Sequence, residues 1–466
     1  LVFGDWSSDV CASDLVLCGS IPLIRRRGSV DIPLRAAFGE RVLEFTENAK
    51  AQGRVLVRYR LLDTRIERSY STAVAFHHRN AATWKDPRWA AAFASPNDAA
   101  VLDLSKFVAG LVRELIRPDL DHALQYGMGL FEGLRLAGLS YSADPSAPYA
   151  EYRGDAAKID YIQYPYQTFA YKGGDSDDLS LLYIVALASV GLETAFVPLP
   201  DKAYAAFALD TPELEARRFF TDPSMFVWRD GKVWVVVDTS RLREGFIPAW
   251  HAGAEAWNRA AAAGNGGDFY PMTAAWQAVR PVGVSAAESR IPKPREDRLE
   301  LAFENAMSRF VAMELGPKVE RIRAELGPSG GTARQLNSLG ILYARYGLLR
   351  EAKDLFAQAV AKGSRPAVIN RANIAFLLRE YDEAARYYGE VLVEDPRNRA
   401  ALLGLARARY ELDAYAEADD LFARLNNMDP AYAAKYAYLS SRVGGASSRA
   451  SAASTRDVSV PWQDED

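Results

Sequence analysis

The stretch that decides the fold reads Ile162-Gln-Tyr-Pro-Tyr-Gln-Thr-Phe-Ala-Tyr-Lys-Gly-Gly-Asp-Ser-Asp-Asp-Leu-Ser180. Its Gly-Gly-Asp turn precedes an apolar run, residues 181–190, that ends at Gly191, and the pattern predicts a helix over residues 177–190. Strand patterns follow at residues 194–198, 204–209, 225–229 and 232–238. One helix packed against several consecutive strands is typical of an α+β unit.

Residues within and after this stretch follow the motif pattern of a known family. The pattern comprises a lead, an acidic turn and a later acidic residue, which here are Gln163, Pro165 and Thr168, then Gly174, Asp175, Asp177 and Asp178, then Asp238. This set resembles the transglutaminase-like branch of the papain-type cysteine peptidase superfamily, in its bacterial members. The resemblance covers residues 104 to about 257. It implies a papain-like transglutaminase core, which we place at residues 103–290.

The residues that would carry the chemistry of that family are changed. Ser176 stands where the family has its nucleophilic cysteine, Lys202 stands in place of the histidine, and Asp238 matches the acid. A serine hydroxyl needs a base within hydrogen-bond reach, and a protonated lysine is not such a base. The resemblance therefore implies a pseudoenzyme with a degenerate triad, in which Ser176 serves as the N-cap of the helix.

An alternative hypothesis keeps catalysis. Ser–Lys pairs catalyse acyl transfer on other folds, so a Ser176/Lys202 pair oriented by Asp238 would make the protein an amidase, a peptidase or a cross-linking enzyme. The two hypotheses differ in one contact, because the enzyme needs a buried Lys202 Nζ within ~3.2 Å of Ser176 Oγ. Under both hypotheses the former cleft is lined by Gln163, Asp175, Asp177 and Asp178.

The composition excludes several kinds of site. Cys11 and Cys18 are the two cysteines of the chain, so the folded body offers no thiol nucleophile, disulfide scaffold or Cys-ligated zinc. The four histidines lack metal-ligand spacing and the glycine clusters lack a phosphate-binding pattern, so we expect no metal and no cofactor. A formal charge of −4 creates no positive field for nucleic acid, which we do not expect as a partner.

The first residues read as a sequence artefact. Residues 5–15, DWSSDVCASDL, resemble a translated sequencing adapter, and the apolar run 15–24 resembles the end of a truncated signal peptide. We therefore set residues 1–27 aside and expect a periplasmic or secreted protein, with a cytoplasmic one as the alternative. The apolar run is shorter than the ~20 residues that a transmembrane helix needs, so we expect no transmembrane span.

A small α+β domain is predicted over residues 28–102. Helical spacing covers residues 31–52, and strand patterns follow at residues 55–61 and 70–76. Two further helical patterns then meet at Pro118.

The C-terminal third contains an internal repeat. Ala352, Ala384 and Ala418 stand at the same position of three successive units, and an aromatic residue follows each of them. These units resemble the tetratricopeptide repeat, which implies an all-α solenoid, with its capping helix, over residues 332–443. A helical linker at residues 291–331 precedes the repeats, and a tail at residues 444–466 is expected to be disordered.

The sequence thus predicts a multidomain α+β protein whose most favoured function is non-catalytic binding. The old cleft would hold a peptide, and the tetratricopeptide array would recruit a protein or peptide partner through its concave surface. An array that only buttresses the core is the competing hypothesis. The flexible glycines at residues 327–331 further predict that the array is separable from the core.

Overall fold

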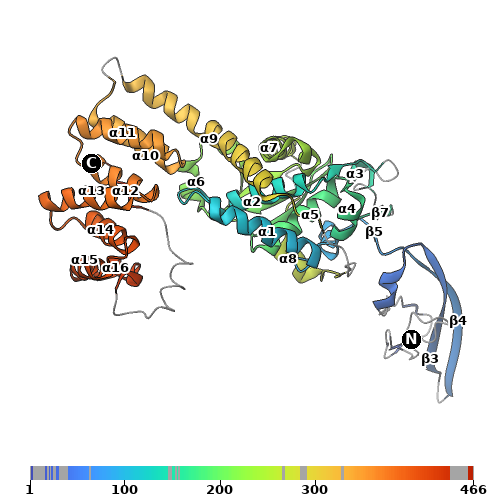
Figure 1. Cartoon of the computed structure of the whole chain (residues 1–466). Helices are drawn as coiled ribbons and strands as arrows, with labels where there is room; N and C mark the ends of the chain where they lie inside the picture. The colour runs from blue at the N-terminus through green and yellow to red at the C-terminus, as the bar shows by residue number, and fades with distance from the viewer. Residues whose placement is uncertain are drawn as a thin grey trace.

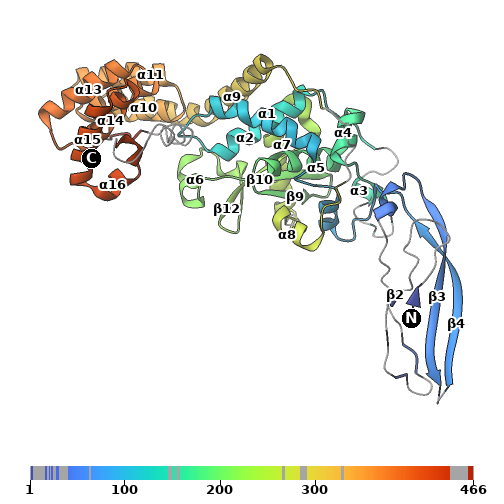
Figure 2. The same cartoon turned by 60° about the horizontal axis from the view of Figure 1, so that its bottom comes forward.

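The computed structural model describes residues 2–3, 16–17, 20, 23–24, 28–30, 40–61, 64–144, 149–152, 155, 158–264, 268–283, 291–326, 330–440 and 460–464. It combines three parts: an N-terminal β-hairpin, a mixed α+β core, and a C-terminal array of helices (Figure 1). The hairpin and the array lie at opposite ends of the core (Figure 2). No helix among these described residues is both long and apolar enough to cross a membrane.

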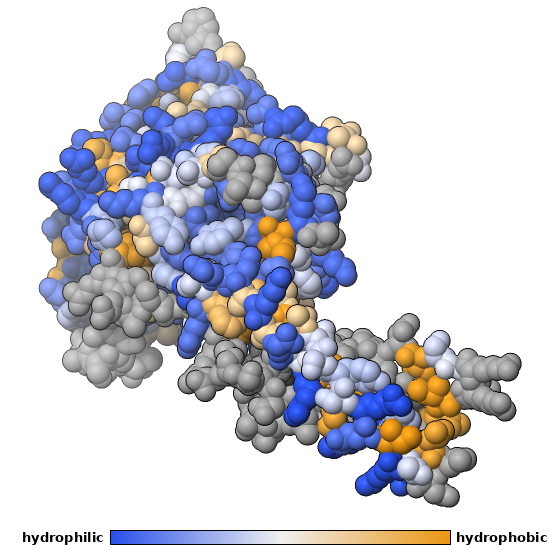
Figure 3. Space-filling view, turned by 90° about the vertical axis from the view of Figure 1, so that its right-hand side faces the viewer, coloured by the Kyte–Doolittle hydropathy of each residue, from blue (hydrophilic) through white to orange (hydrophobic). Residues whose placement is uncertain are grey.

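The N-terminal hairpin consists of β3 (Ala49–Leu61) and β4 (Thr64–Phe76), which are paired along their full length. β1 (Val2–Phe3) and β2 (Val16–Leu17) extend it to a sheet of order β2-β1-β3-β4. Leu61 and Tyr70 are exposed on the hairpin, and hydrophobic residues are visible along it in Figure 3.

The helix predicted over residues 31–52 is not formed in the described part of that range. Residues 40–44 form one short turn, η1 (Glu40–Glu44), and residues 49–52 belong to β3. Pairing with β4 supplies backbone hydrogen bonds that override the local helical spacing. Residues 31–39, Cys11, Cys18 and most of the segment 1–27 lie outside the described residues.

The main hydrophobic cluster of the core begins ahead of residue 103. Trp84 and Phe93 belong to it, and Ala91 at the end of η2 (Pro87–Ala92) is also buried there. The chain segment after the hairpin therefore packs with the core. It is fixed further by β5 (Ala81–Ala82), which pairs antiparallel with β7 (Asp160–Tyr161).

Two glycines allow the first two core helices to pack closely. α1 (Ala99–Leu115) and α2 (His122–Leu136) flank Pro118 as predicted, and Asp121 is the N-cap of α2. A Cβ at Gly129 would lie 2.3 Å from a methyl group of Val112. A Cβ at Gly133 would lie 2.7 Å from a methyl group of Val108. The backbone of α2 therefore approaches α1 at a distance that a side chain would prevent.

A five-stranded antiparallel sheet of order β11-β12-β10-β9-β13 lies between helices. Its strands are β9 (Thr194–Pro198), β10 (Ala203–Ala208), β11 (Val227–Arg229), β12 (Lys232–Val237) and β13 (Tyr270–Pro271). Alternate residues of β10 face opposite ways: Phe207 packs in the cluster of α5 (Ser176–Ser189), and Ala206 packs against α7 (Phe246–Ala262).

Shorter elements complete the core. They are β6 (Ser140–Tyr141), α3 (Tyr149–Tyr152), α4 (Pro165–Tyr171), β8 (Gly173–Gly174), α6 (Glu213–Phe219), η3 (Pro223–Met225), η4 (Thr239–Glu244) and α8 (Met272–Ala278). A long helix, α9 (Glu296–Leu326), runs from the core to the array and coincides with the predicted linker helix (Figure 1).

The array contains six helices in antiparallel pairs, followed by a short cap. They are α10 (Ala333–Arg345), α11 (Leu349–Ala361), α12 (Pro366–Leu377), α13 (Tyr381–Glu394), α14 (Arg399–Glu411), α15 (Tyr415–Met428), α16 (Pro430–Ala434) and η5 (Ala437–Leu439). The three repeated alanines, Ala352, Ala384 and Ala418, are fully buried. Small residues at these positions let the paired helices cross closely.

The first helix pair is joined to the core around Tyr346. Its ring stacks on Phe219 at 5.4 Å, its hydroxyl accepts a hydrogen bond from Lys318 Nζ at 2.6 Å, and its carbonyl accepts one from Arg117 at 3.0 Å. Arg117 also pairs with Glu304 of α9. The array therefore shares buried contacts with the core, and the structure does not support the prediction that it is separable.

The prediction that residues 444–466 are disordered is wrong for the C-terminal segment, residues 460–464. Val460 is buried among array side chains, and Trp462 stacks on Phe356 with ring centroids 6.1 Å apart. An apolar residue and a large aromatic ring provide enough contact area to order a short peptide on a preformed surface. Residues 441–459 lie outside the described residues.

Candidate functional site

The N-cap of α5 is an acidic residue and not the serine that the sequence analysis expected. Asp175 is the N-cap, and its carboxylate accepts a hydrogen bond from the backbone N–H of Asp178 at 3.4 Å. Asp178 in turn accepts from the backbone N–H of Asp175 at 3.3 Å, which completes a reciprocal capping box. The prediction that Ser176 is the N-cap is therefore wrong, because Ser176 is the first residue of the helix proper.

Ser176 is directed at the neighbouring strand. Its buried Oγ accepts a hydrogen bond from the backbone N–H of Ala203, at 3.3 Å, where β10 begins. Ser180, one turn further along α5, donates to or accepts from Thr239 at 2.9 Å. The hydroxyl groups of α5 thus fasten the helix to the strands beneath it.

Lys202 binds Asp238. The Lys202 Nζ donates to Asp238 Oδ2 at 2.7 Å and to Ser240 Oγ at 2.8 Å. The Asp238 side chain is nearly inaccessible at 4% exposure, whereas Lys202 retains 27%. Asp238 also accepts from the Ser240 hydroxyl and backbone N–H, and Arg241 Nε lies 4.0 Å from its Oδ2.

The three predicted triad positions converge but do not form a catalytic pair. Ser176 contacts the backbone of Ala203, the residue next to Lys202, and Lys202 reaches Asp238. Among the described residues, the hydrogen-bond partners of Lys202 Nζ are Asp238 and Ser240, and Ser176 is not one of them. The hydrogen-bond partner of the Ser176 hydroxyl within the described part of the chain is the backbone N–H of Ala203.

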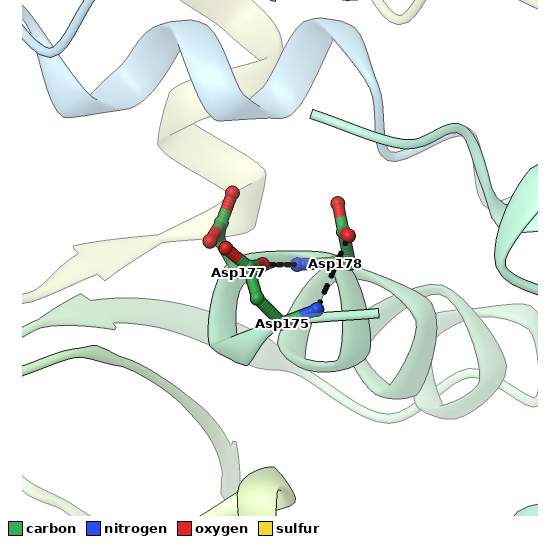
Figure 4. A group of neighbouring side chains, drawn as sticks. All are labelled: Asp175, Asp177 and Asp178. Atoms are coloured by element: carbon green, nitrogen blue, oxygen red, sulfur yellow. Dashed lines mark hydrogen bonds between the residues drawn. The ribbon is translucent and has the colours of Figure 1, made fainter. Parts of the chain in front are cut away.

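Three carboxyl groups gather at the start of α5, as Figure 4 shows. One oxygen from each of Asp175, Asp177 and Asp178 lies within 4.8 Å of the others, and all three side chains are buried. Asp177 is fully buried, and apart from the neighbouring carboxyl group of Asp175 neither of its oxygens has a hydrogen-bond partner among the described residues. A cation could be held at this spacing, but the positive end of the α5 dipole points at the same place and disfavours it.

Burial determines the protonation of this cluster. Removal from water raises the pKa of Asp177 well above its ordinary value, and the nearby Asp175 raises it further. Burial, together with Asp175, also raises the pKa of Asp178 well above its ordinary value. Asp178 and Asp160 act in the same direction on the pKa of Asp177, and no cation is among its main influences.

A cavity of ≈ 520 Å³ opens beside this cluster. Gln163, Asp175 and Asp178 line it, whereas Asp177 does not, because its side chain is fully buried in the protein interior. The backbone N–H of Gln163 donates to Asp178 at 2.7 Å, which fixes one wall of the cavity.

A second polar site lies on the array, and sequence reasoning missed it. Asn337 of α10 and Asn370 and Asn373 of α12 are buried side by side against the C-terminal segment; we call them the asparagine face. A signal was present in the sequence, because Asn337 and Asn370 are 33 residues apart (370 − 337), close to one repeat length.

Comparisons with known proteins identify a tetratricopeptide region in the C-terminal part of the chain. Residues 375–443 match the tetratricopeptide repeat family. Among solved structures, a tetratricopeptide repeat protein from Parabacteroides merdae ATCC 43184 is similar, with 20% identity and a TM-score of 0.23. That match covers 30% of this chain and about half (51%) of the other. No curated protein matches the chain.

The fold and the family match together define the protein as a multidomain α+β protein with a C-terminal tetratricopeptide region. Such repeats suggest interaction with other proteins.

Proposed function

We propose that this protein is a non-catalytic binding protein in which the helical array takes an extended peptide from a partner protein. One observation carries the proposal: the asparagine face directs buried side-chain amides at a peptide backbone. Asn337, Asn370 and Asn373 each donate to a main-chain carbonyl, at 2.9, 2.6 and 2.9 Å. Amides that bind main-chain groups recognise an extended peptide irrespective of most of its side chains.

The core fits the same proposal as a degenerate transglutaminase-like domain. Ser176 lies at the first turn of a buried helix, Lys202 directly precedes β10, and Asp238 directly follows β12, which supports this proposal. The Lys202–Asp238 ion pair supports loss of catalysis, since it leaves the serine without a base. The core then serves as the support on which the array is mounted.

Peptide display against the full-length chain tests the proposal. We expect selected peptides to lose about tenfold or more in affinity on the Asn370→Ala variant, because each lost hydrogen bond to a buried partner costs ~1–3 kcal/mol. Asn427→Ala is the matched control, because Asn427 is exposed on α15 of the same array. Failure to select any peptide that depends on Asn370 would refute the array as a peptide-binding surface.

A further inference from the structure

The asparagine face is occupied by the chain itself. We propose that residues 460–464, Val-Pro-Trp-Gln-Asp, are a tethered competitor that resembles the partner, so that the partner peptide carries a Pro-aromatic pair followed by an acidic residue. This inference rests on the proposed function and specifies the ligand of the same site. Its basis is the set of contacts that the C-terminal segment makes.

Backbone contacts hold the segment in an extended form. The side-chain amide of Asn370 engages Gln463 at both main-chain groups: it accepts from the N–H at 2.8 Å and donates to the carbonyl at 2.6 Å. Asn337 donates to the same carbonyl at 2.9 Å. Asn373 donates to the carbonyl of Pro461 at 2.9 Å. Two asparagines thus clamp one residue, and a third fixes the residue two positions earlier.

The amides are oriented before a ligand arrives. The Tyr388 hydroxyl donates to Asn373 Oδ1 at 2.6 Å, and Asn370 donates to Asn337 Oδ1 at 2.8 Å. With their oxygens satisfied inside the array, Asn373 and Asn337 can present only their N–H groups to a ligand. The face is therefore built to receive carbonyl oxygens, and an unoccupied face would leave these donors to water.

Side chains of the segment supply the sequence preference. Trp462 stacks on Phe356 at an interplanar angle of 19°, and its indole N–H donates to Asp119 of the core at 3.1 Å. Val460 is buried among array residues, and Asp464 accepts from the Ser338 hydroxyl at 3.0 Å. A partner peptide would satisfy the same contacts with an apolar residue, an aromatic residue two positions later, and an acidic residue after that.

Covalent attachment makes the segment a competitor. An intramolecular ligand acts at an effective concentration that reaches the millimolar range, whereas a free peptide binds at its actual concentration. A free peptide with the same contacts must therefore displace the segment, and its apparent affinity for the full-length chain is lowered. Removing the segment should restore the affinity.

The experiment uses a fluorescein-labelled peptide of residues 456–466 and fluorescence anisotropy. Its dissociation constant is measured on the full-length chain and on a variant that ends at residue 459. We expect the truncated variant to bind about tenfold or more tightly than the full-length chain, and a peptide with Trp462→Ala to lose about tenfold. Asn370→Ala in the truncated variant should weaken binding similarly, and Asn427→Ala should leave it unchanged.

Circular dichroism checks that the truncated variant is folded. If it is not, the full-length Trp462→Ala variant replaces it, and the same increase in peptide affinity is expected. Peptide that fails to bind the folded protein, while display-selected peptides still bind through Asn370, would overturn the inference and leave the proposed function intact. Loss of both kinds of binding would overturn both. A dimer that dissociates on truncation would place the segment on a second copy and overturn the intramolecular assignment.

Discussion

Replacing Asp177 by Asn should stabilise the protein at neutral pH and not at acidic pH. Asp177 is fully buried, its oxygens have no partner among the described residues other than the carboxyl group of Asp175, and its pKa in the folded protein is raised well above the ordinary value. In the unfolded chain the same carboxyl group ionises at its ordinary pKa. The folded state therefore holds a proton that the unfolded state releases as the pH rises.

The sign and size of the effect follow from this difference. The contribution of Asp177 to stability is fully present below about pH 4, where both states are protonated, and it is lost as the pH rises toward the raised folded pKa. The loss amounts to about 1.4 kcal/mol for each pH unit in that window. An asparagine keeps the shape and the donor of the neutral carboxyl group but does not titrate, so it avoids the loss.

The assay is urea unfolding of the two proteins at several pH values between about 4 and 8. We expect similar midpoints at the acidic end and a growing advantage of Asp177→Asn as the pH rises. Asp382→Asn, an exposed change at the start of α13, is the control and should show no growing difference. A variant that is less stable than wild type at pH 8, together with destabilisation of wild type by a chelator, would refute the reasoning and indicate a bound cation at the cluster.

Three further predictions concern Ser176, Lys202 and the array. Ser176→Cys should react slowly with iodoacetamide at about pH 6, since position 202 carries a lysine and not an imidazole that would lower the thiol pKa. Labelling faster than that of free cysteine would contradict this expectation. The double variant Ser176→Cys/Lys202→His is the comparison and should react faster. Lys202→Ala should cost ~1–3 kcal/mol in urea unfolding, because it removes the hydrogen-bonded cation of a buried carboxylate and leaves only Arg241 Nε at 4.0 Å. Lys232→Ala, in an exposed ion pair, should cost less than ~1 kcal/mol, and equal costs would argue against the buried pair. Gly404→Ala should destabilise the array by ~1–3 kcal/mol, since its Cβ would lie 2.2 Å from a buried tyrosine ring. Gly389→Ala is the control: its Cβ would meet nothing within 4 Å, so the change should be neutral or stabilising. A lower melting temperature for Gly389→Ala than for Gly404→Ala would show that the helices cross elsewhere.

The elements around α5 could be predicted from sequence because local pattern and tertiary packing agree there. The apolar run after Asp175 becomes a helix buried on all sides, and the strand expected at residues 194–198 is β9 with the same bounds. The helix expected within the linker at residues 291–331 is α9, Glu296–Leu326. In these segments the apolar side chains whose regular spacing predicts a helix or a strand are also the side chains that become buried.

The missed features depend on partners far away in the chain. β3 forms because β4 pairs with it, and no local pattern at residues 49–52 encodes that pairing. The C-terminal segment is ordered because Asn337, Asn370 and Phe356, which lie 93 to 126 residues earlier than the residues they contact, receive it. Composition alone made this segment look disordered.

The candidate site shows the same division. A motif could suggest that Ser176, Lys202 and Asp238 converge. It could not show that Lys202 binds the aspartate rather than the serine, because Lys202 also bonds to Ser240, which lies beside Asp238. Asp177 could be placed on the first turn of α5 but not turned inward, since its orientation is set by how the helix sits on the sheet.

The contacts of Tyr346 with the core make the stability of the array against local unfolding differ between its two ends. In a stack of repeats each unit is supported by its neighbours, so local unfolding starts at whichever end is least supported. The first helix pair is fastened to α6, α9 and Arg117, whereas α15 is followed only by the five-residue helix α16 and η5 in the described part of the chain. Fraying is thereby directed toward the distal end, and the asparagine face on α10 and α12 sits on the portion that opens last.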